Sequence, residues 1–318
     1  APAKPRKKED STSKQIRGSS LMLVGRTISL VANFAIQVLI VRFLSKADYG
    51  SFAYAMSFVT VGQTLATFGL DRAITRFVPI YHERRDFNKL FGTILLVIGT
   101  ILSIGTLLIV AAFAFQGLIG QTLLNDQSDS KGQVIALLLI LIGLAPVQAL
   151  DDLIAALFAL FASPRAIFFR KYILAPGLKL SVVLLLMFFR SDEFFLASGY
   201  LAAGILGTTV YAFTLFRTLQ KQELFKEFRL RELTVPAREL FAFTIPLMTS
   251  DLVYVLMSAS DAVLLGYFRS TSEVAAFRAI LPSAVLNQFV LQSFTILFTP
   301  IAARLFAHVR IGFGRQVA

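Results

Sequence analysis

The sequence predicts an all-α polytopic membrane protein, and three observations support this fold class. Hydrophobic residues make up 56% of the 318 residues and charged residues only 16%, whereas a soluble domain needs about 25% charged residues for its surface. The apolar residues gather into eight runs, each long enough to cross a bilayer as a helix of about 20 residues. The basic residues alternate regularly between the two sides that these runs define.

The eight runs are joined, on the side opposite the N-terminus, by segments too short to form a folded domain. The first run is not a cleaved signal peptide, because it is too long, lacks a small-residue cleavage site and follows an unusually basic arm. The runs cover residues 20–44, 50–74, 90–116, 133–161, 168–189, 193–216, 240–267 and 274–303.

The basic residues predict how the chain is oriented. Of the 31 Lys and Arg residues, 23 lie on the side of the N-terminus, five on the opposite side and three inside runs. Because loops rich in Lys and Arg stay in the cytoplasm, we expect a multi-pass protein of the cell membrane with a cytoplasmic N-terminus. This topology also accounts for the net charge of +12, so no nucleic acid is expected as a partner. The 23 include Arg165, Arg170 and Lys171, counted with the loop after the fourth run.

An internal repeat relates the end of the first run to the end of the seventh. Four residue pairs match at an offset of 225 residues: Phe43 with Phe268, Ser45 with Ser270, Asp48 with Glu273, and Phe52 with Phe277. An even number of runs separates the copies, so both have the same orientation in the membrane. This arrangement is typical of parallel repeats related by an axis along the membrane normal.

The repeat predicts a first lobe of six helices followed by the first two helices of a second lobe. Since the remaining helices of that second lobe are missing, we expect the chain to be truncated at its C-terminus. Between the lobes, apolar residues recur near helical spacing among Lys and Arg, which indicates an amphipathic helix on the membrane surface; a solvated linker is the alternative. The predicted domains are a disordered basic cytoplasmic arm (1–19), the first lobe (20–216), the amphipathic linker (217–239), the start of the second lobe (240–305) and a tail (306–318).

Basic side chains at membrane depth are the first candidate functional residues, because a charge in lipid is costly and marks a functional site by default. Arg26, Lys179 and Arg278 fall inside runs, and Arg72 closes the second run. Arg26 and Lys179 could instead extend to the membrane surface. For Arg72 the alternative is an ion pair with its neighbour Asp71.

Acidic residues at depth are the second group of candidates. Asp251 and Asp261 both lie in the seventh run, about 15 Å apart along a helix and on broadly the same face. With Asp71, they could form a relay for protons or ions, act as counter-charges that position the basic residues, or make salt bridges between the lobes.

Several classes of chemistry are excluded by residue types that the sequence lacks. The chain has no Cys and only two His, His82 and His308, which excludes disulfides, thiolate metal sites and a His-rich metal centre. There is no P-loop, so an ATP-driven pump is not encoded. The adjacent Asp151 and Asp152 could bind a metal in a lipid-phosphate sugar transferase, but two carboxylates alone do not predict such a site. No enzyme, cofactor or metal is expected.

Four stretches of the chain resemble one known family. They are Arg17-Gly-Ser-Ser, Val41-Arg-Phe-Leu-Ser-Lys-Ala-Asp-Tyr-Gly-Ser-Phe-Ala-Tyr-Ala55, Phe68-Gly-Leu-Asp-Arg-Ala-Ile-Thr-Arg-Phe77 and Asp261-Ala-Val-Leu-Leu-Gly-Tyr-Phe268. They look like polysaccharide biosynthesis proteins, the Wzx-type oligosaccharide flippases of the multidrug/oligosaccharidyl-lipid/polysaccharide exporter superfamily. The resemblance runs from residue 17 to about residue 305, and its motifs are diffuse hydrophobic patterns.

The resemblance implies a MATE-like fold, with two six-helix lobes in a V around a cavity that opens alternately to each side. It implies flipping of an undecaprenyl-pyrophosphate-linked oligosaccharide between leaflets, with Arg26, Arg72, Arg278 and, as a weaker match, Lys179 holding the pyrophosphate. The partners that it implies are the lipid-linked oligosaccharide, membrane lipid, a polysaccharide polymerase and a chain-length regulator. The chain departs from the family in length, since family members have more helices than these eight runs.

Two other functions remain as alternatives. A cation-coupled multidrug antiporter would share the fold, but such proteins favour acidic cavity residues, whereas Arg26, Lys179 and Arg278 are basic. A membrane glycosyltransferase or polysaccharide polymerase usually needs a large external loop or an acidic cytoplasmic loop. Here the external loops are short and the cytoplasmic loops are basic.

Overall fold

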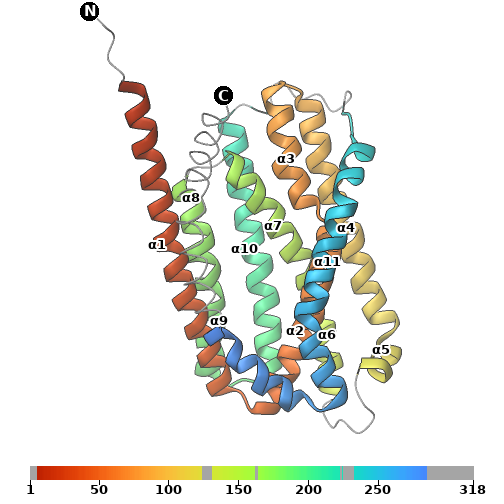
Figure 1. Cartoon of the computed structure of the whole chain (residues 1–318). Helices are drawn as coiled ribbons and strands as arrows, with labels where there is room; N and C mark the ends of the chain where they lie inside the picture. The colour runs from red at the N-terminus through yellow and green to blue at the C-terminus, as the bar shows by residue number, and fades with distance from the viewer. Residues whose placement is uncertain (1–5, 124–130, 162–163, 223, 225–232, 285–318) are drawn as a thin grey trace, which may run out of the picture.

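A computed structural model describes residues 6–123, 131–161, 164–222, 224 and 233–284 of the chain, and these form a bundle of long helices with no strand among them (Figure 1). Within these ranges, six helical stretches are long and apolar enough to cross a membrane. They are Val24–Phe43, Phe87–Ala114, Lys131–Phe161, Ala166–Phe189, Glu193–Lys221 and Ala237–Phe268. The prediction of an all-α polytopic membrane protein is therefore confirmed.

The bundle is built from elements that follow one another with short connections. In Figure 1, α1, α8 and α9 lie on one side, α3, α4 and α11 on the other, and α7 and α10 between them. The bounds are α1 Arg6–Phe43, α2 Lys46–Thr67, α3 Leu70–Glu83, α4 Phe87–Ala114, α5 Gln116–Leu123, α6 Lys131–Leu141, α7 Leu144–Phe161, α8 Pro164–Phe168, the π-helix η1 Phe169–Leu174, α9 Ala175–Phe189, α10 Glu193–Lys221 and α11 Ala237–Phe268; residues 271–284 are also helical.

The predicted N-terminal arm can be compared with the structure, whereas parts of the predicted linker and of the C-terminal region cannot. Helix α1 begins at Arg6, within the arm 1–19 for which the sequence predicts disorder. A formed helix lengthens at little cost, because each added residue brings one more hydrogen bond. Part of the predicted amphipathic linker (223 and 225–232), most of the eighth run (285–303) and the tail (306–318) lie outside the described residues.

The second run, 50–74, is not one helix as predicted. Helix α2 ends at Thr67, and Phe68 and Gly69 follow with φ angles of 52° and 67° before α3 begins. Glycine adopts this left-handed backbone without strain, while the N–H of Phe68 still bonds to the carbonyl of Thr64 at 3.1 Å. The break places Arg72 on α3, a separate helix.

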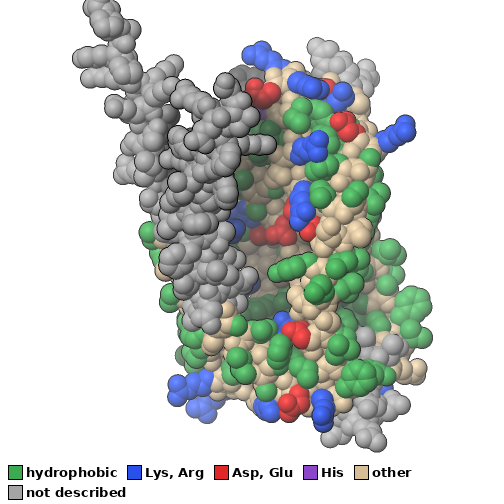
Figure 2. Space-filling view, in the orientation of Figure 1, with side chains coloured by type: hydrophobic (Ala, Val, Ile, Leu, Met, Phe, Trp, Pro, Cys, Tyr) green, Lys and Arg blue, Asp and Glu red, His purple; other side chains and the backbone are tan. Residues whose placement is uncertain are grey.

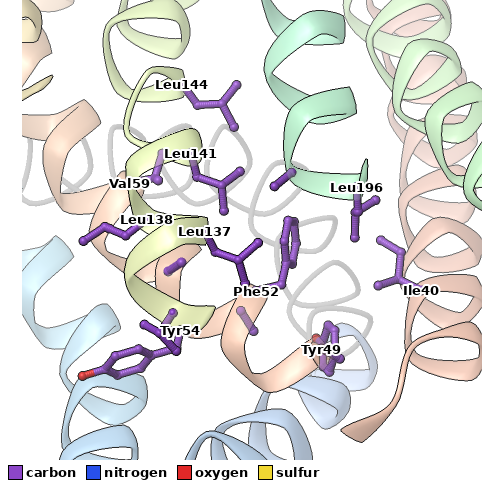
Figure 3. Close-up of a cluster of buried hydrophobic side chains, with 14 of the residues drawn as sticks. Ile40, Tyr49, Phe52, Tyr54, Val59, Leu137, Leu138, Leu141, Leu144 and Leu196 are labelled. Atoms are coloured by element: carbon purple, nitrogen blue, oxygen red, sulfur yellow. The ribbon is translucent and has the colours of Figure 1, made fainter. Parts of the chain in front are cut away.

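Helix α2 is not among the six stretches that are apolar enough to cross a membrane, and it faces protein on several sides. It packs against α4, α6, α7 and α11 at the centre of the bundle (Figure 1). Ser51 and Ser57 on α2 are buried and hydrogen-bonded. Figure 3 shows the apolar part of this contact, where Phe52 and Val59 of α2 meet Leu137 and other residues of α6 and α10.

The internal repeat corresponds to the same local structure in both copies. Helix α1 ends at Phe43 and α2 begins after Ser45, whose hydroxyl accepts the N–H of Asp48 at 3.1 Å. In the second copy, α11 ends at Phe268, and the hydroxyl of Ser270 accepts the N–H of Glu273 at 3.4 Å. A Ser with an acidic residue three positions later is a helix-start signal. The matched residues therefore begin equivalent helices.

The two equivalent helix starts cross at equivalent positions. A β-carbon on Gly50 would overlap the carbonyl oxygen of Thr271 and lie 3.3 Å from the β-carbon of Ala275. Ala275 is the residue that stands 225 positions after Gly50. Farther along, Gly266 of α11 packs directly on the ring of Tyr54 of α2. Small residues thus bring α2 into close contact with the second copy of the repeat.

This crossing predicts that Gly50 tolerates no larger side chain. Gly50→Ala should lower the apparent melting temperature of the purified protein in detergent by several degrees, since overpacking costs about 1 to 3 kcal/mol. Gly99→Ala is the matched control, because a β-carbon on Gly99 meets no described atom within 4 Å. Its melting temperature should stay the same or rise, as alanine is the better helix former. Equal shifts for both variants would contradict the crossing.

Candidate functional site

A cavity of about 620 Å³ lies inside the bundle, between α1, α2, η1, α9, α10 and residues 271–284. Four basic side chains line it: Arg26, Lys171, Lys179 and Arg278. No carboxylate is among the described residues that line it. The structure therefore brings together three of the four basic residues that the sequence singled out, and adds Lys171.

The rest of the lining is a mixture of aliphatic, aromatic and uncharged polar residues, and two of its tyrosine rings lie near the lysines. The Nζ atom of Lys179 lies 6.0 Å from the ring centroid of Tyr200, and that of Lys171 lies 6.0 Å from the ring of Tyr172. These distances are at the limit of a cation–π contact. The uncharged polar and aromatic lining residues are Ser29, Asn33, Phe34, Gln37, Tyr49, Phe52, Tyr172 and Tyr200.

A smaller chamber of about 160 Å³ adjoins the cavity and shares Lys179, Tyr200 and Met56 with it. Asp151 lies on the wall of this chamber. Lys179 therefore lies between the cavity, whose described charged lining residues are all basic, and the carboxylate of Asp151 on α7.

Arg278 is held to two other helices. Its Nη2 donates to the hydroxyl of Ser57 on α2 at 2.9 Å and lies 3.8 Å from Oδ1 of Asp261 on α11. Its buried Nε has no hydrogen-bond partner among the described residues. A buried donor without a partner is unusual. Asp261 is thus the acidic neighbour of Arg278, and its role as a counter-charge or in a relay stays a prediction.

Arg72 lies outside the cavity, in the contact between α3 and α11. Its Nη2 is 2.5 Å from Oδ1 of Asp251, and the two side chains are 46% and 29% exposed. The predicted alternative, an ion pair of Arg72 with Asp71, is therefore wrong, because the break before α3 turns Arg72 toward α11. Asp71 forms no ion pair with another described residue.

Two further contacts support the packing of α3 on α11. The guanidinium carbon of Arg76 lies 4.4 Å from the ring centroid of Phe243, and the hydroxyl of Tyr81 donates to Glu239 at 3.2 Å. Burial, together with the neighbouring Glu239 carboxylate, raises the pKa of Tyr81 to about 12. The hydroxyl therefore keeps its proton, and its bond to Glu239, at neutral pH.

The profile of the polysaccharide biosynthesis protein family matches residues 16–306, most of the chain. The chain belongs to this family. It is also 22% identical over 304 residues to an uncharacterized membrane protein of Methanocaldococcus jannaschii. That match covers 92% of the chain but 58% of the relative, so the chain spans a little over half of its length. No solved structure matches the chain.

In this polysaccharide biosynthesis protein, two basic residues lie elsewhere than the sequence predicts. The count of basic residues places Arg170 and Lys171 in a loop, yet both lie in Ala166–Phe189, one of the six stretches apolar enough to cross a membrane. Only 8% of the Arg170 side chain is exposed, and its Nη2 lies 2.6 Å from Oδ1 of Asp151. The available signal was the start of the fifth run at residue 168, which already includes both residues.

The adjacent carboxylates of α7 do not act together. Asp151 pairs with Arg170, whereas Asp152 accepts a hydrogen bond from Gln63 of α2 at 2.7 Å. In the described part of the chain, no group of three or more acidic or His side chains could hold a metal ion. The two carboxylates are used separately, one within α7–η1 packing and one against α2.

The Arg72–Asp251 pair can be tested by a double-mutant cycle. Arg72→Gln and Asp251→Asn should each lower the melting temperature slightly, and the double variant should lower it by less than the sum. Because Arg72 is about half exposed, we expect a coupling of only about 0.5 kcal/mol. Tyr81→Phe with Glu239→Gln gives a second cycle on the same contact. Strictly additive effects in both cycles would show that α3 and α11 do not meet as described.

Proposed function

We propose that this polysaccharide biosynthesis protein moves a lipid-linked oligosaccharide, attached through a pyrophosphate to undecaprenol, from the cytoplasmic to the outer leaflet. The observation that carries the proposal is the basic cavity at membrane depth. It is lined by Arg26, Lys171, Lys179 and Arg278, with no carboxylate among the described lining residues. The process has no covalent step.

The physical problem is to carry a diphosphate and sugars through about 30 Å of hydrocarbon. An anion in that layer is expensive unless charges of opposite sign surround it. Arginine suits this task, because its planar guanidinium binds phosphate oxygens through two N–H groups and keeps its charge when buried. The cavity volume falls within the usual range for small-molecule sites, about 300 to 1,000 Å³, which fits the diphosphate with its first sugar rather than a whole glycan.

The orientation follows from the distribution of basic residues. The end of the bundle at which α1 begins also carries Arg84, Arg85, Lys89 and Lys221 (Figure 1), and by sequence this side holds 23 of the 31 Lys and Arg residues, against five on the opposite side. Figure 2 shows Lys and Arg side chains at both ends. By the positive-inside rule, the more basic side of the chain supports a cytoplasmic location for this end. Figure 2 also shows a hollow on one face of the molecule with acidic and basic side chains in it.

Access would alternate by movement of two lobes, the first formed by α1 to α10 and the second beginning with α11. Arg278 belongs to the second and bonds to Ser57 of the first, so the cavity is built from both. A relative motion of the two would therefore change the cavity directly. The lining does not favour cationic drugs as cargo, since its described charges are all basic.

Charge removal in the cavity tests the proposal. Arg278→Gln and Arg26→Gln should each reduce surface polysaccharide at least tenfold in cells that depend on this protein, with unchanged protein levels in the membrane. Arg278→Lys should retain part of the activity, because it keeps the charge but not the two-pronged contact. The same variants should fail to move labelled lipid-linked oligosaccharide across proteoliposome membranes.

Arg217→Gln is the matched control for these variants. Arg217 lies on α10 against the ring of Phe213, 4.4 Å from its centroid, and does not line the cavity. Its loss removes the same charge from outside the site and should leave export unchanged. If Arg278→Gln and Arg26→Gln export as well as Arg217→Gln does, the cavity does not carry the anion.

A further inference from the structure

The fifth membrane-spanning stretch contains a π-helical segment, η1, between α8 and α9. π-Helical segments are rare in proteins, and those that occur are often found at functional sites. Two consecutive residues of η1, Lys171 and Tyr172, line the cavity. The residue just before them, Arg170, is buried and is not among the residues that line the cavity.

The side chain of Arg170 is enclosed by α7 and α10. Its Nη2 donates both to the carboxylate of Asp151, at 2.6 Å, and to the backbone carbonyl of the same residue, at 3.0 Å. The guanidinium carbon lies 3.9 Å from the ring centroid of Tyr211 and 5.2 Å from that of Phe158. A buried guanidinium held this way cannot turn without leaving a charge unpaired in the membrane.

The backbone of Arg170 is held from the same direction. Its carbonyl oxygen accepts the N–H of Ala175, five residues on, which is the hydrogen bond that defines a π-turn. The same oxygen also accepts the hydroxyl of Tyr211 at 2.8 Å. Tyr211 therefore contacts Arg170 twice, with its ring against the guanidinium and its hydroxyl on the carbonyl.

On the other side of η1, helix α1 confines Tyr172. A β-carbon on Gly25 would overlap the ring of Tyr172 and lie 2.7 Å from the ring of Phe168. The ring therefore packs on bare helix backbone. Segment η1 is thus fixed between α7 and α10 behind it and α1 in front, with Lys171 directed into the space that remains.

We propose that Arg170 is a positioning residue, which locks the π-turn through Asp151 and Tyr211 and so holds Lys171 and Tyr172 on the wall of the cavity. An ordinary α-turn would rotate these two residues relative to α9 and remove Lys171 from the basic lining. The effect on transport rests on the proposed function, but the placement of Lys171 can be measured without any substrate.

The experiment uses the absence of cysteine from the chain, so that a single introduced cysteine is labelled uniquely. Lys171→Cys reports on η1, and Ser29→Cys reports on the α1 wall of the same cavity. The rate of reaction with a charged, membrane-impermeant methanethiosulfonate is measured for each in proteoliposomes. In the Arg170→Met background, the rate at Lys171→Cys should fall at least fivefold while the rate at Ser29→Cys stays within twofold.

Two milder backgrounds keep the test decisive if Arg170→Met does not fold. Tyr211→Phe removes only the hydroxyl that bonds to the Arg170 carbonyl, and it should reduce labelling at Lys171→Cys by a smaller factor. Arg170→Lys keeps the charge next to Asp151 and should restore part of the rate. A merely structural role of Arg170 would change both reporter positions together.

The outcomes separate this inference from the proposed function. Unchanged labelling at Lys171→Cys, or parallel changes at Ser29→Cys, overturns the positioning role whatever happens to export. Reduced labelling in the Arg170→Met protein supports the positioning role. If export by that protein nevertheless remains normal, the positioning role stands and the participation of Lys171 in transport is overturned.

Discussion

The cost of a charge in hydrocarbon is the constraint on which the arrangement of this protein depends. Arg170 is enclosed by Asp151 and two aromatic rings, and Arg278 is tied to Ser57 and Asp261. Each of these contacts joins different helices, and charged residues at membrane depth generally face the bundle interior and pair with one another or with backbone carbonyls. The polar contacts of Arg170 and Arg278 therefore favour particular helix pairs. The apolar residues favour close packing of the helices but do not by themselves specify which helices are neighbours.

The same constraint separates two uses of basic residues. Arg170 has its charge matched within the bundle and lies behind the cavity wall. Lys171, the next residue, lines the cavity. One turn of π-helix thus places adjacent cations in opposite environments, one matched by the protein and one directed toward space that a ligand can fill. Under the proposed function, Lys171 binds an anionic group of the substrate.

The sequence predicts the parts of this structure that depend on local composition. Spans such as Phe87–Ala114 follow from hydropathy, and the matched helix starts at Ser45 and Ser270 follow from a short capping pattern. The cavity residues Arg26, Lys179 and Arg278 were found because charges are rare in such runs. Their roles in transport remain proposals.

The remaining features depend on contacts between distant residues. The pairing of Arg72 with Asp251 joins positions 179 apart in the chain, and no local pattern specifies it. The break at Phe68 is carried by only one glycine, which is tolerated inside many membrane helices. No local sequence pattern marks η1 as a π-helix, because the π-turn depends on the contacts of Arg170 with α7 and α10.

The crossing of Gly50 with Ala275 has a consequence for how the two copies of the repeat can diverge. In a symmetric pair of separate chains, a residue on the axis meets its own copy, so one substitution changes both sides of the contact. Once both copies lie on one chain, the two sides can change independently, but their combined volume still has to fit. Glycine on one side and alanine on the other satisfy that limit. A methyl group at position 50 would also overlap the carbonyl oxygen of Thr271, so of the two matched positions only 275 has room for one.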